Sequence, residues 1–254
     1  MFTPDLILAF LTLTFLEIIL GIDNIIFISI LASRFPETER KKLMRVGLLL
    51  AMLMRVVLLM GINWLVQIQT PLVRFSTKWI SSEITVQSII LLAGGLFLLY
   101  KSTKEIYDKV EDLENTEEQQ KTSQFSFSRA LIQIVLIDIV FSFDSILTAV
   151  GMTSGIAHAL PIMIFAVVVA ILIMMLFAAP VSSFINKHPS LQVLGLSFLL
   201  LIGFMLITDA AQLSQTTIFG ASIGTIPKGY LYFAIAFSLG VEMINMRFRK
   251  GAKN

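Results

Sequence analysis

The sequence predicts an all-α membrane protein with seven transmembrane helices, arranged as two inverted three-helix repeats followed by a C-terminal helix. Three observations favour this fold: the composition, the long apolar runs, and an acidic motif that occurs twice. Of the 254 residues, 56% are hydrophobic and 14% are charged, whereas a soluble domain carries about 25% charged residues. The chain is therefore built mainly for contact with lipid.

Seven apolar runs are long enough to cross a bilayer as helices, which takes about 18 or more residues. The first run differs from a secretory signal because it is longer and contains Glu17 and Asp23. Glycines at 94–95 and 195–203 are expected to let the third and sixth spans pack closely. The predicted spans are residues 6–33, 43–66, 84–100, 130–153, 160–185, 191–208 and 230–246.

Basic residues collect on one side of the predicted membrane. Three cations, Arg74, Lys78 and Lys228, fall on the opposite side, and Arg55 falls in the middle of the second span. By the positive-inside rule, the N-terminus faces out and the C-terminus faces the cytoplasm. The basic residues on the cytoplasmic side are Arg34, Arg40, Lys41, Lys42, Arg45, Lys101, Lys104, Lys109, Lys121, Arg129, Lys187, Arg247, Arg249, Lys250 and Lys253.

The chain divides into four predicted parts. Residues 1–103 form the first three-helix repeat, and 104–126 form an acidic, flexible cytoplasmic linker. Residues 127–210 form the second, inverted repeat, and 211–254 form the seventh helix and a basic cytoplasmic tail. The formal net charge of +2 does not indicate a nucleic-acid partner, and the lack of cysteine excludes thiolate metal ligands and thiol catalysis.

The first and fourth spans contain the same acidic motif, aligned without gaps. An acid, five residues, a second acid and a small polar residue occur in both. The second copy lies three spans after the first, so the two copies run in opposite directions through the membrane, as in many transporters with a midplane substrate site. The matched pairs are Glu17 with Asp138, Asp23 with Asp144, and Asn24 with Ser145.

The four acids suggest a cation site. A charge at the bilayer centre costs about 2.5–3.5 kcal/mol on insertion scales, and a bound cation would offset this cost. Together with Asn24 and Ser145 the acids offer oxygen ligands only, which suit Mn²⁺, Ca²⁺ and Mg²⁺. Two neighbouring carboxylates in a low-dielectric site also disfavour each other's charged form. One is thus expected to take a proton when the metal leaves, which would couple metal movement to protons.

The spacing of the acids poses a geometric problem. Residues six apart on an α-helix are separated by about 9 Å of rise and about 120° of rotation. Gly21 and Ser142 lie inside the two motifs, so a kink or break is expected at each. If the helices are regular instead, Glu17 and Asp138 would form a second ion or proton station apart from Asp23 and Asp144.

Two further charged residues in the spans call for an explanation. Arg55 is expected to pair with an acid as a counter-ion, or to act as a positive plug that replaces the metal in the empty state. Glu242 is expected either to form an ion pair with Arg247 or Arg249 near the membrane surface or to act as a gating acid.

The segment Leu16 to Asn24, taken with Asp138 to Ser145, resembles the TerC family of integral membrane proteins, named for tellurium resistance. The resemblance covers nearly the whole chain and includes His188-Pro189-Ser190 and Pro227-Lys228-Gly229-Tyr230. It implies a seven-span fold related in plan to LysE-type exporters, in the inner membrane, with a role in manganese efflux or in metal supply to exported proteins. The metal-site positions that it implies are Glu17, Asp23, Asn24, Asp138 and Asp144.

These observations favour a transporter, and specifically an exporter, of a divalent cation, with Mn²⁺ ahead of Ca²⁺ and Mg²⁺ as the substrate. The expected partners are the lipid bilayer, the metal ion and protons; no tightly bound cofactor and no enzymatic activity are expected, and a homo-oligomer is left open. One alternative is a membrane scaffold in a metal- or tellurite-resistance complex. Another is an intramembrane aspartyl protease using Asp23 and Asp144, although its Gly-x-Gly-Asp pattern is absent.

Overall fold

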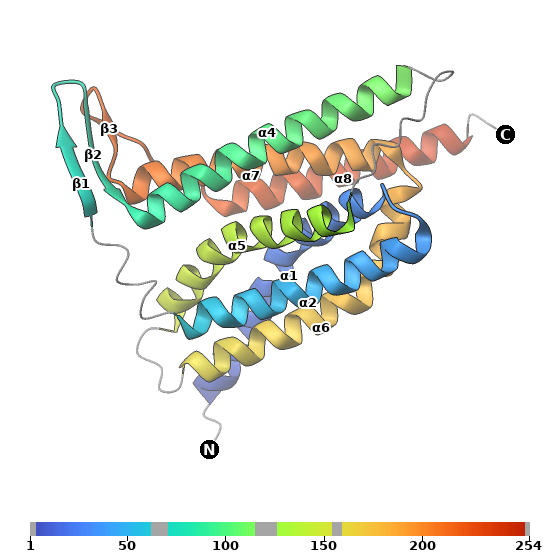
Figure 1. Cartoon of the computed structure of the whole chain (residues 1–254), viewed down its shortest axis with the longest axis horizontal. Coiled ribbons are helices and arrows are strands. Elements are labelled where there is room, and N and C mark those ends of the chain that lie inside the picture. The colour runs from blue at the N-terminus through green and yellow to red at the C-terminus, as the bar shows by residue number, and fades with distance from the viewer. Residues whose placement is uncertain (1–3, 62–70, 115–125, 154–158, 252–254) are drawn as a thin grey trace. The chain divides into compact units, whose positions relative to one another are not determined.

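The computed structural model describes residues 4–61, 71–114, 126–153 and 159–251. Within these residues seven helices are long and apolar enough to cross a membrane, which confirms the predicted number of spans. The helices (Figure 1) are α1 (Pro4–Ala32), α2 (Glu37–Met60), α4 (Val86–Glu114), α5 (Phe127–Met152), α6 (Ala159–Asn186), α7 (Pro189–Leu213) and α8 (Lys228–Gly251).

The helices belong to two compact units, and the first contains α1, α2, α5 and α6. In this unit α1 packs most extensively against α6, and α2 packs against both α5 and α6. In the predicted repeat, α1 corresponds to α5 and α2 corresponds to α6. The contact between α1 and α6 therefore corresponds to the contact between α5 and α2. The helix pairing is therefore the one that two related halves would make around a common centre.

A tight turn joins α1 to α2. Pro36 precedes α2 and has an extended backbone conformation (φ −54°, ψ 154°), which ends the first helix before the second begins. The Arg40 guanidinium reaches back from α2 and donates hydrogen bonds to the carbonyl oxygens of Ser33 and Phe35, at 3.4 and 3.3 Å. Arg40 thus satisfies carbonyl groups that the end of a helix leaves open.

The second unit contains α4, α7 and α8 together with a small sheet. The helices α4 and α7 cross at Gly95 and Gly203: a Cβ atom added to Gly95 would lie 2.7 Å from the Gly203 carbonyl oxygen, and one added to Gly203 would lie 3.0 Å from that of Gly95. The predicted close packing at these glycines is confirmed. Close backbone approach between helices depends on small residues of this kind.

The sheet has four antiparallel strands in the order β1-β2-β3-β4 and was not predicted. The strands β1 (Pro71–Ser76) and β2 (Ile80–Thr85) precede α4, and β3 (Thr217–Ile218) and β4 (Ala221–Ser222) lie between α7 and α8. The sheet joins two connections far apart in the sequence through the pairs Ile80 with Ile218 and Ser81 with Thr217. Short strands in loops between long apolar runs leave little periodicity to detect.

The flexible linker predicted from residue 104 begins later than expected, because α4 continues to Glu114. Glu105 lies inside this helix, is only 3% exposed, and forms an ion pair of 2.6 Å with Lys101 one turn earlier. This pairing keeps the polar end of α4 helical. Residues 115–125 of the predicted linker lie outside the described residues.

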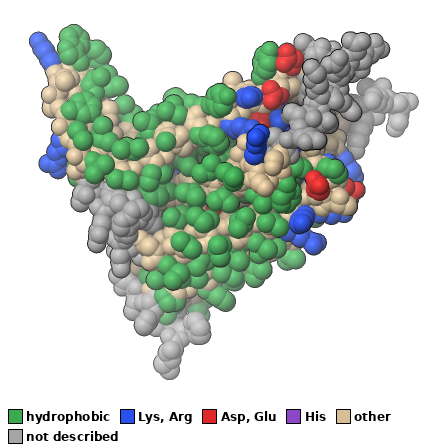
Figure 2. Space-filling model, in the orientation of Figure 1, with side chains coloured by type: hydrophobic (Ala, Val, Ile, Leu, Met, Phe, Trp, Pro, Cys, Tyr) green, Lys and Arg blue, Asp and Glu red, His purple; other side chains and the backbone are tan. Residues whose placement is uncertain are grey.

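Hydrophobic side chains cover much of the outer surface of the helices. Figure 2 shows them over the visible faces of α2 and α6, with charged side chains at the helix ends. Large apolar side chains of α2, α6 and α8, such as Leu53, Leu176 and Phe233, are exposed. Such a surface is expected of helices that face lipid.

Candidate functional site

The helices that carry the acidic motifs are continuous. α1 runs from Pro4 through Gly21, and α5 runs from Phe127 through Ser142, so the predicted break at each motif is wrong. Gly21 serves packing instead: a Cβ atom there would lie 2.0 Å from the Met174 sulfur of α6. The small residue allows α1 and α6 to approach each other, and it does not unwind α1.

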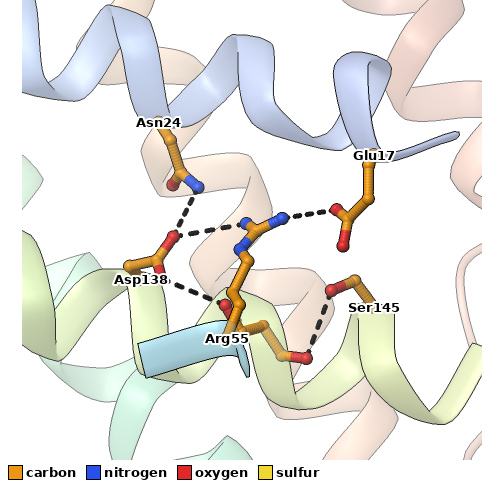
Figure 3. Close-up of polar contacts among 6 residues, drawn as sticks. Glu17, Asn24, Arg55, Asp138 and Ser145 are labelled. Atoms are coloured by element: carbon orange, nitrogen blue, oxygen red, sulfur yellow. Dashed lines mark hydrogen bonds and ion pairs between the residues drawn. The ribbon is translucent and has the colours of Figure 1, made fainter. Parts of the chain in front are cut away.

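In a regular helix, the two acids of each motif, which are six residues apart, point in different directions. The first acid instead shares its direction with the small polar residue seven positions later. Residues seven apart on an α-helix differ by only about 20° in direction. Glu17 and Asn24 therefore share one face of α1, and Asp138 and Ser145 share one face of α5. Figure 3 shows these two faces turned toward each other, with the helices antiparallel and Asn24 opposite Asp138.

Arg55 of α2 bridges the first acids of the two copies. Its Nη1 donates to Glu17 Oε2, and its Nη2 donates to Asp138 Oδ1 at 3.2 Å (Figure 3). Arg55, Glu17 and Asp138 are 1%, 8% and 2% exposed. The expectation that Arg55 pairs with an acid of the cluster is confirmed, and a buried guanidinium of this kind needs such partners.

This bridge has no counterpart from the second copy. Helix α6 corresponds to α2 in the repeat, and its residues, from Ala159 to Asn186, include no charged side chain. A single cation from the first copy therefore serves one acid from each copy. The guanidinium lies between the carboxylates, where a shared cation would lie.

Asp138 is held by three donors. Besides Arg55, the Asn24 amide donates to Oδ1 at 3.0 Å, and the Ser142 hydroxyl donates to Oδ2 at 3.1 Å. For Glu17, the described contact is the one from Arg55. The two acids are thus equivalent in the motif but differ in their surroundings.

Ser142 is a site residue that the sequence interpretation treated only as a helix-breaking position. It lies one turn after Asp138, and its carbonyl oxygen also accepts a 3.2 Å hydrogen bond from the Ser145 hydroxyl. The signal was present in the sequence, because a hydroxyl four residues after an acid shares its helix face. Ser145 lies on the same face but, among the described contacts, bonds to its own helix.

The described part of the site contains two acids and one arginine. If all three are ionised, one negative charge is in excess. Among the described residues no group of three or more His, Asp or Glu side chains lies close enough together to hold a metal ion. The side chains of Asp23 and Asp144 lie outside the described residues, although α1 and α5 carry these two positions. Their predicted role as metal ligands stays a prediction.

Glu242 belongs to the second unit. Its Oε1 accepts a 2.6 Å hydrogen bond from the Ser190 hydroxyl, so α8 is tied to the start of α7. Both residues line a cavity of about 360 Å³ between these two helices. The Arg249 side chain lies outside the described residues, and the predicted ion pair and gating role of Glu242 stay predictions.

Comparison with known proteins gives a consistent result. A family model described as "Integral membrane protein TerC family" matches residues 2–254. A UPF0053 protein of Haemophilus influenzae is 44% identical to this chain and covers 97% of it and 96% of that relative. The UPF0053 inner membrane protein YgdQ of Escherichia coli K12 is 44% identical over 96% of this chain and 93% of that protein. The UPF0053 protein YegH of the same strain is 41% identical, but the match covers only 42% of its length. No solved structure matches the chain.

Proposed function

The chain belongs to the TerC family of integral membrane proteins, and on this premise we propose that it transports a divalent cation, with Mn²⁺ as the first candidate substrate. One observation carries the proposal. Two buried carboxylates, Glu17 and Asp138, come from the two inverted copies of one motif and converge on a single positive group, that of Arg55. Inverted repeats place the substrate sites of many transporters at such a centre.

Arg55 would act as an internal competitor for the transported ion. The guanidinium satisfies the carboxylates while no metal is bound, so that two charges are not left unpaired in a dry interior. A divalent cation entering between Glu17 and Asp138 would displace it and supply a second positive charge. Of the two roles predicted for Arg55, we thus propose the positive plug that replaces the metal. The ion pairs of Arg55 with Glu17 and Asp138 would then represent the state without metal.

The ligand chemistry favours a hard cation. The described acids, Asn24 and the serines offer oxygen atoms, and the amide of Asn24 could turn its carbonyl oxygen toward a metal once Asp138 is engaged. Asp23 and Asp144 would complete the site as further carboxylates. Oxygen ligands of this kind suit Mn²⁺, Mg²⁺ and Ca²⁺ better than Zn²⁺ or Cu⁺.

We further propose export from the cytoplasm through the inner membrane, the membrane that the name of the relative YgdQ gives for that protein. When the metal leaves, the carboxylates would have to regain Arg55 or take up a proton, because two adjacent charges in a low-dielectric site repel each other. Metal exit would then be coupled to proton entry. A flux that does not change with a pH gradient in proteoliposomes would argue against this coupling.

The direct test is metal flux in proteoliposomes that contain the purified full chain. Uptake of Mn²⁺, Ca²⁺ and Mg²⁺ is compared for the wild type and for Glu17→Gln, Asp23→Asn, Asp138→Asn and Asp144→Asn. Glu39→Gln is the matched control, because Glu39 is an exposed acid in the first turn of α2, outside the site. Loss of flux in the site variants, with normal flux in Glu39→Gln, is the expected result.

The same measurement separates the transporter from the membrane scaffold. A scaffold in a stress-resistance complex would need its fold but not its buried carboxylates. Normal metal-resistance growth with Asp138→Asn, together with no flux in the wild type, would favour the scaffold.

A further inference from the structure

The first unit contains a cavity between the beginning of α2 and the end of α6, and neither Glu17 nor Asp138 lines it. Its volume is about 500 Å³, and its walls come from the first turns of α2 and the last turns of α6. The positive-inside rule predicts that this end of the unit faces the cytoplasm. Figure 2 shows charged side chains near this end, next to the hydrophobic surface of the two helices.

The rim of this cavity is strongly basic. Arg40, Lys41, Arg45 and Lys187 line it, against a single acid, Glu37. Glu37 is already paired with Lys41 at 2.8 Å, and both side chains are largely exposed. Four cations and one acid leave an excess of three positive charges among the lining residues. A cavity with this excess of positive charge would repel metal cations and attract an anion.

Arg40 is fixed in place for such a role. Its Nη2 is held by the Ser33 and Phe35 carbonyl oxygens at the turn between α1 and α2. Its Nε is buried and has no hydrogen-bond partner among the described residues. The positive charge of the guanidinium, rather than this buried N–H group, is therefore what would attract an anion to the cavity.

The deeper wall of the cavity is apolar. Met44 and Leu48 of α2 face Met175 and Ala178 of α6 below the basic rim. The buried Ser182 hydroxyl lies between the two zones and accepts a 3.2 Å hydrogen bond from Asn186. A small inorganic anion would use the rim and leave the apolar wall uncovered, whereas an amphiphile would use both.

We propose that this cavity binds the phosphodiester headgroup of an anionic phospholipid, with Arg40, Arg45 and Lys187 around the phosphate and the upper part of an acyl chain against Met44, Leu48 and Ala178. Basic pockets between transmembrane helices on the cytoplasmic side are suited to anionic lipid headgroups. The bound lipid would join α2, which carries Arg55, to α6. The proposal concerns a site distinct from the carboxylates and does not depend on the transported ion.

The test uses the full chain purified in a neutral detergent. Phosphatidylglycerol or phosphatidylcholine is titrated in, and the Tm of the wild type is followed together with the lipid retained in native mass spectra. Phosphatidylglycerol is expected to raise the Tm and to remain bound, and phosphatidylcholine is not. Inorganic phosphate and glycerol phosphate are tested alongside. If either raises the Tm as much as phosphatidylglycerol does, the ligand of the cavity is a free anion and the lipid proposal is wrong.

Paired variants locate the site. In Arg45→Gln/Lys187→Gln the affinity for phosphatidylglycerol is expected to fall on the order of tenfold or more, because each removed cation weakens the attraction to an anionic headgroup. The control Arg129→Gln/Lys104→Gln removes one Arg and one Lys from exposed positions outside the cavity and is expected to bind as the wild type does. Arg45→Lys/Lys187→Arg keeps the charges and is expected to retain binding.

A further variant blocks the cavity without removing a charge, and so tests lipid binding separately from the loss of cations. Ala179→Trp fills the cavity from the exposed face of α6 and leaves every cation in place. It is expected to exclude the lipid while its Tm without added lipid stays near the wild-type value. Equal retention of phosphatidylglycerol by the wild type, Arg45→Gln/Lys187→Gln and Ala179→Trp would overturn the proposal.

Discussion

Asn24 of α1 donates a 3.0 Å hydrogen bond to Asp138 of α5, a residue 114 positions later in the chain. Asp138 is the counterpart of Glu17 in the repeated motif, so the acid of the second copy is held by the amide of the first. Antiparallel helices make this possible, because they bring the end of one motif opposite the beginning of the other (Figure 3). The two copies thus complete one site between them.

Asn24→Ala tests this link directly. The substitution removes a donor to a buried carboxylate and is expected to cost about 1.5–3 kcal/mol in the free energy of unfolding. Ser145→Ala is the matched control, since it removes the equivalent side chain of the second copy, whose described bond is to a carbonyl oxygen of its own helix. Denaturant unfolding in detergent measures both. A larger loss in Ser145→Ala than in Asn24→Ala would contradict this assignment.

Arg55→Gln is expected to be strongly destabilising. It leaves the Glu17 and Asp138 carboxylates buried without their shared cation, and breaking a buried ion pair in this way costs about 3–5 kcal/mol. If the site accepts a divalent cation, Mn²⁺ should raise the Tm of Arg55→Gln by more than it raises that of the wild type. Arg55→Lys keeps the charge, so its Tm should lie between those of the wild type and Arg55→Gln. An unchanged Tm for Arg55→Gln would show that the bridge contributes nothing.

Neutralising Glu17, Asp138 and Arg55 together separates the structural and functional roles of this bridge. In Glu17→Gln/Asp138→Asn/Arg55→Gln neither acid of the bridge is left charged without its arginine, so much of the stability lost in Arg55→Gln should return. The variant should nonetheless carry no divalent cation in the flux measurement described above. Metal flux in this folded, neutral variant would mean that the transport pathway lies elsewhere.

Gly95→Ala is expected to disrupt the crossing of α4 and α7. The added Cβ would lie 2.7 Å from the Gly203 carbonyl oxygen, a backbone atom that cannot move without shifting its helix, and overpacking of this kind costs about 1–3 kcal/mol. Gly240→Ala in α8 is the control, since nothing lies within 4 Å of its added Cβ. The difference between their Tm values is the measurement. Equal Tm values would indicate that the crossing tolerates a methyl group.

Gly21→Ala should be milder than Gly95→Ala. Its added Cβ meets the Met174 sulfur, which belongs to a flexible side chain that can move aside. Any loss of transport in Gly21→Ala should therefore appear without a large fall in Tm. A Tm as low as that of Gly95→Ala would show that the α1–α6 contact is rigid.

Much of this architecture could be predicted from the chain alone. Seven helices, the repeat and the pairing of Arg55 with an acid follow from apolar length, gapless self-similarity and the cost of burying a lone charge, all of which are local or internal properties of the sequence. The close crossing at Gly95 was predicted on the same basis, because small residues in an apolar helix have few other uses. The sheet was missed, because strands this short carry little pattern of their own.

The sequence by itself determined that Glu17 and Asp138 are buried and that a cation must accompany them, because burial follows from the apolar runs around them. Only the tertiary structure decided which residues share the centre. The regular helices turn Asn24 and Ser142 inward with Glu17 and Asp138, and α2 brings Arg55 between the two carboxylates. The physical reason is that the direction of a side chain depends on helix phase and on the packing of neighbouring helices. At Gly21, for example, α1 stays helical and the missing side chain leaves room for Met174 of α6.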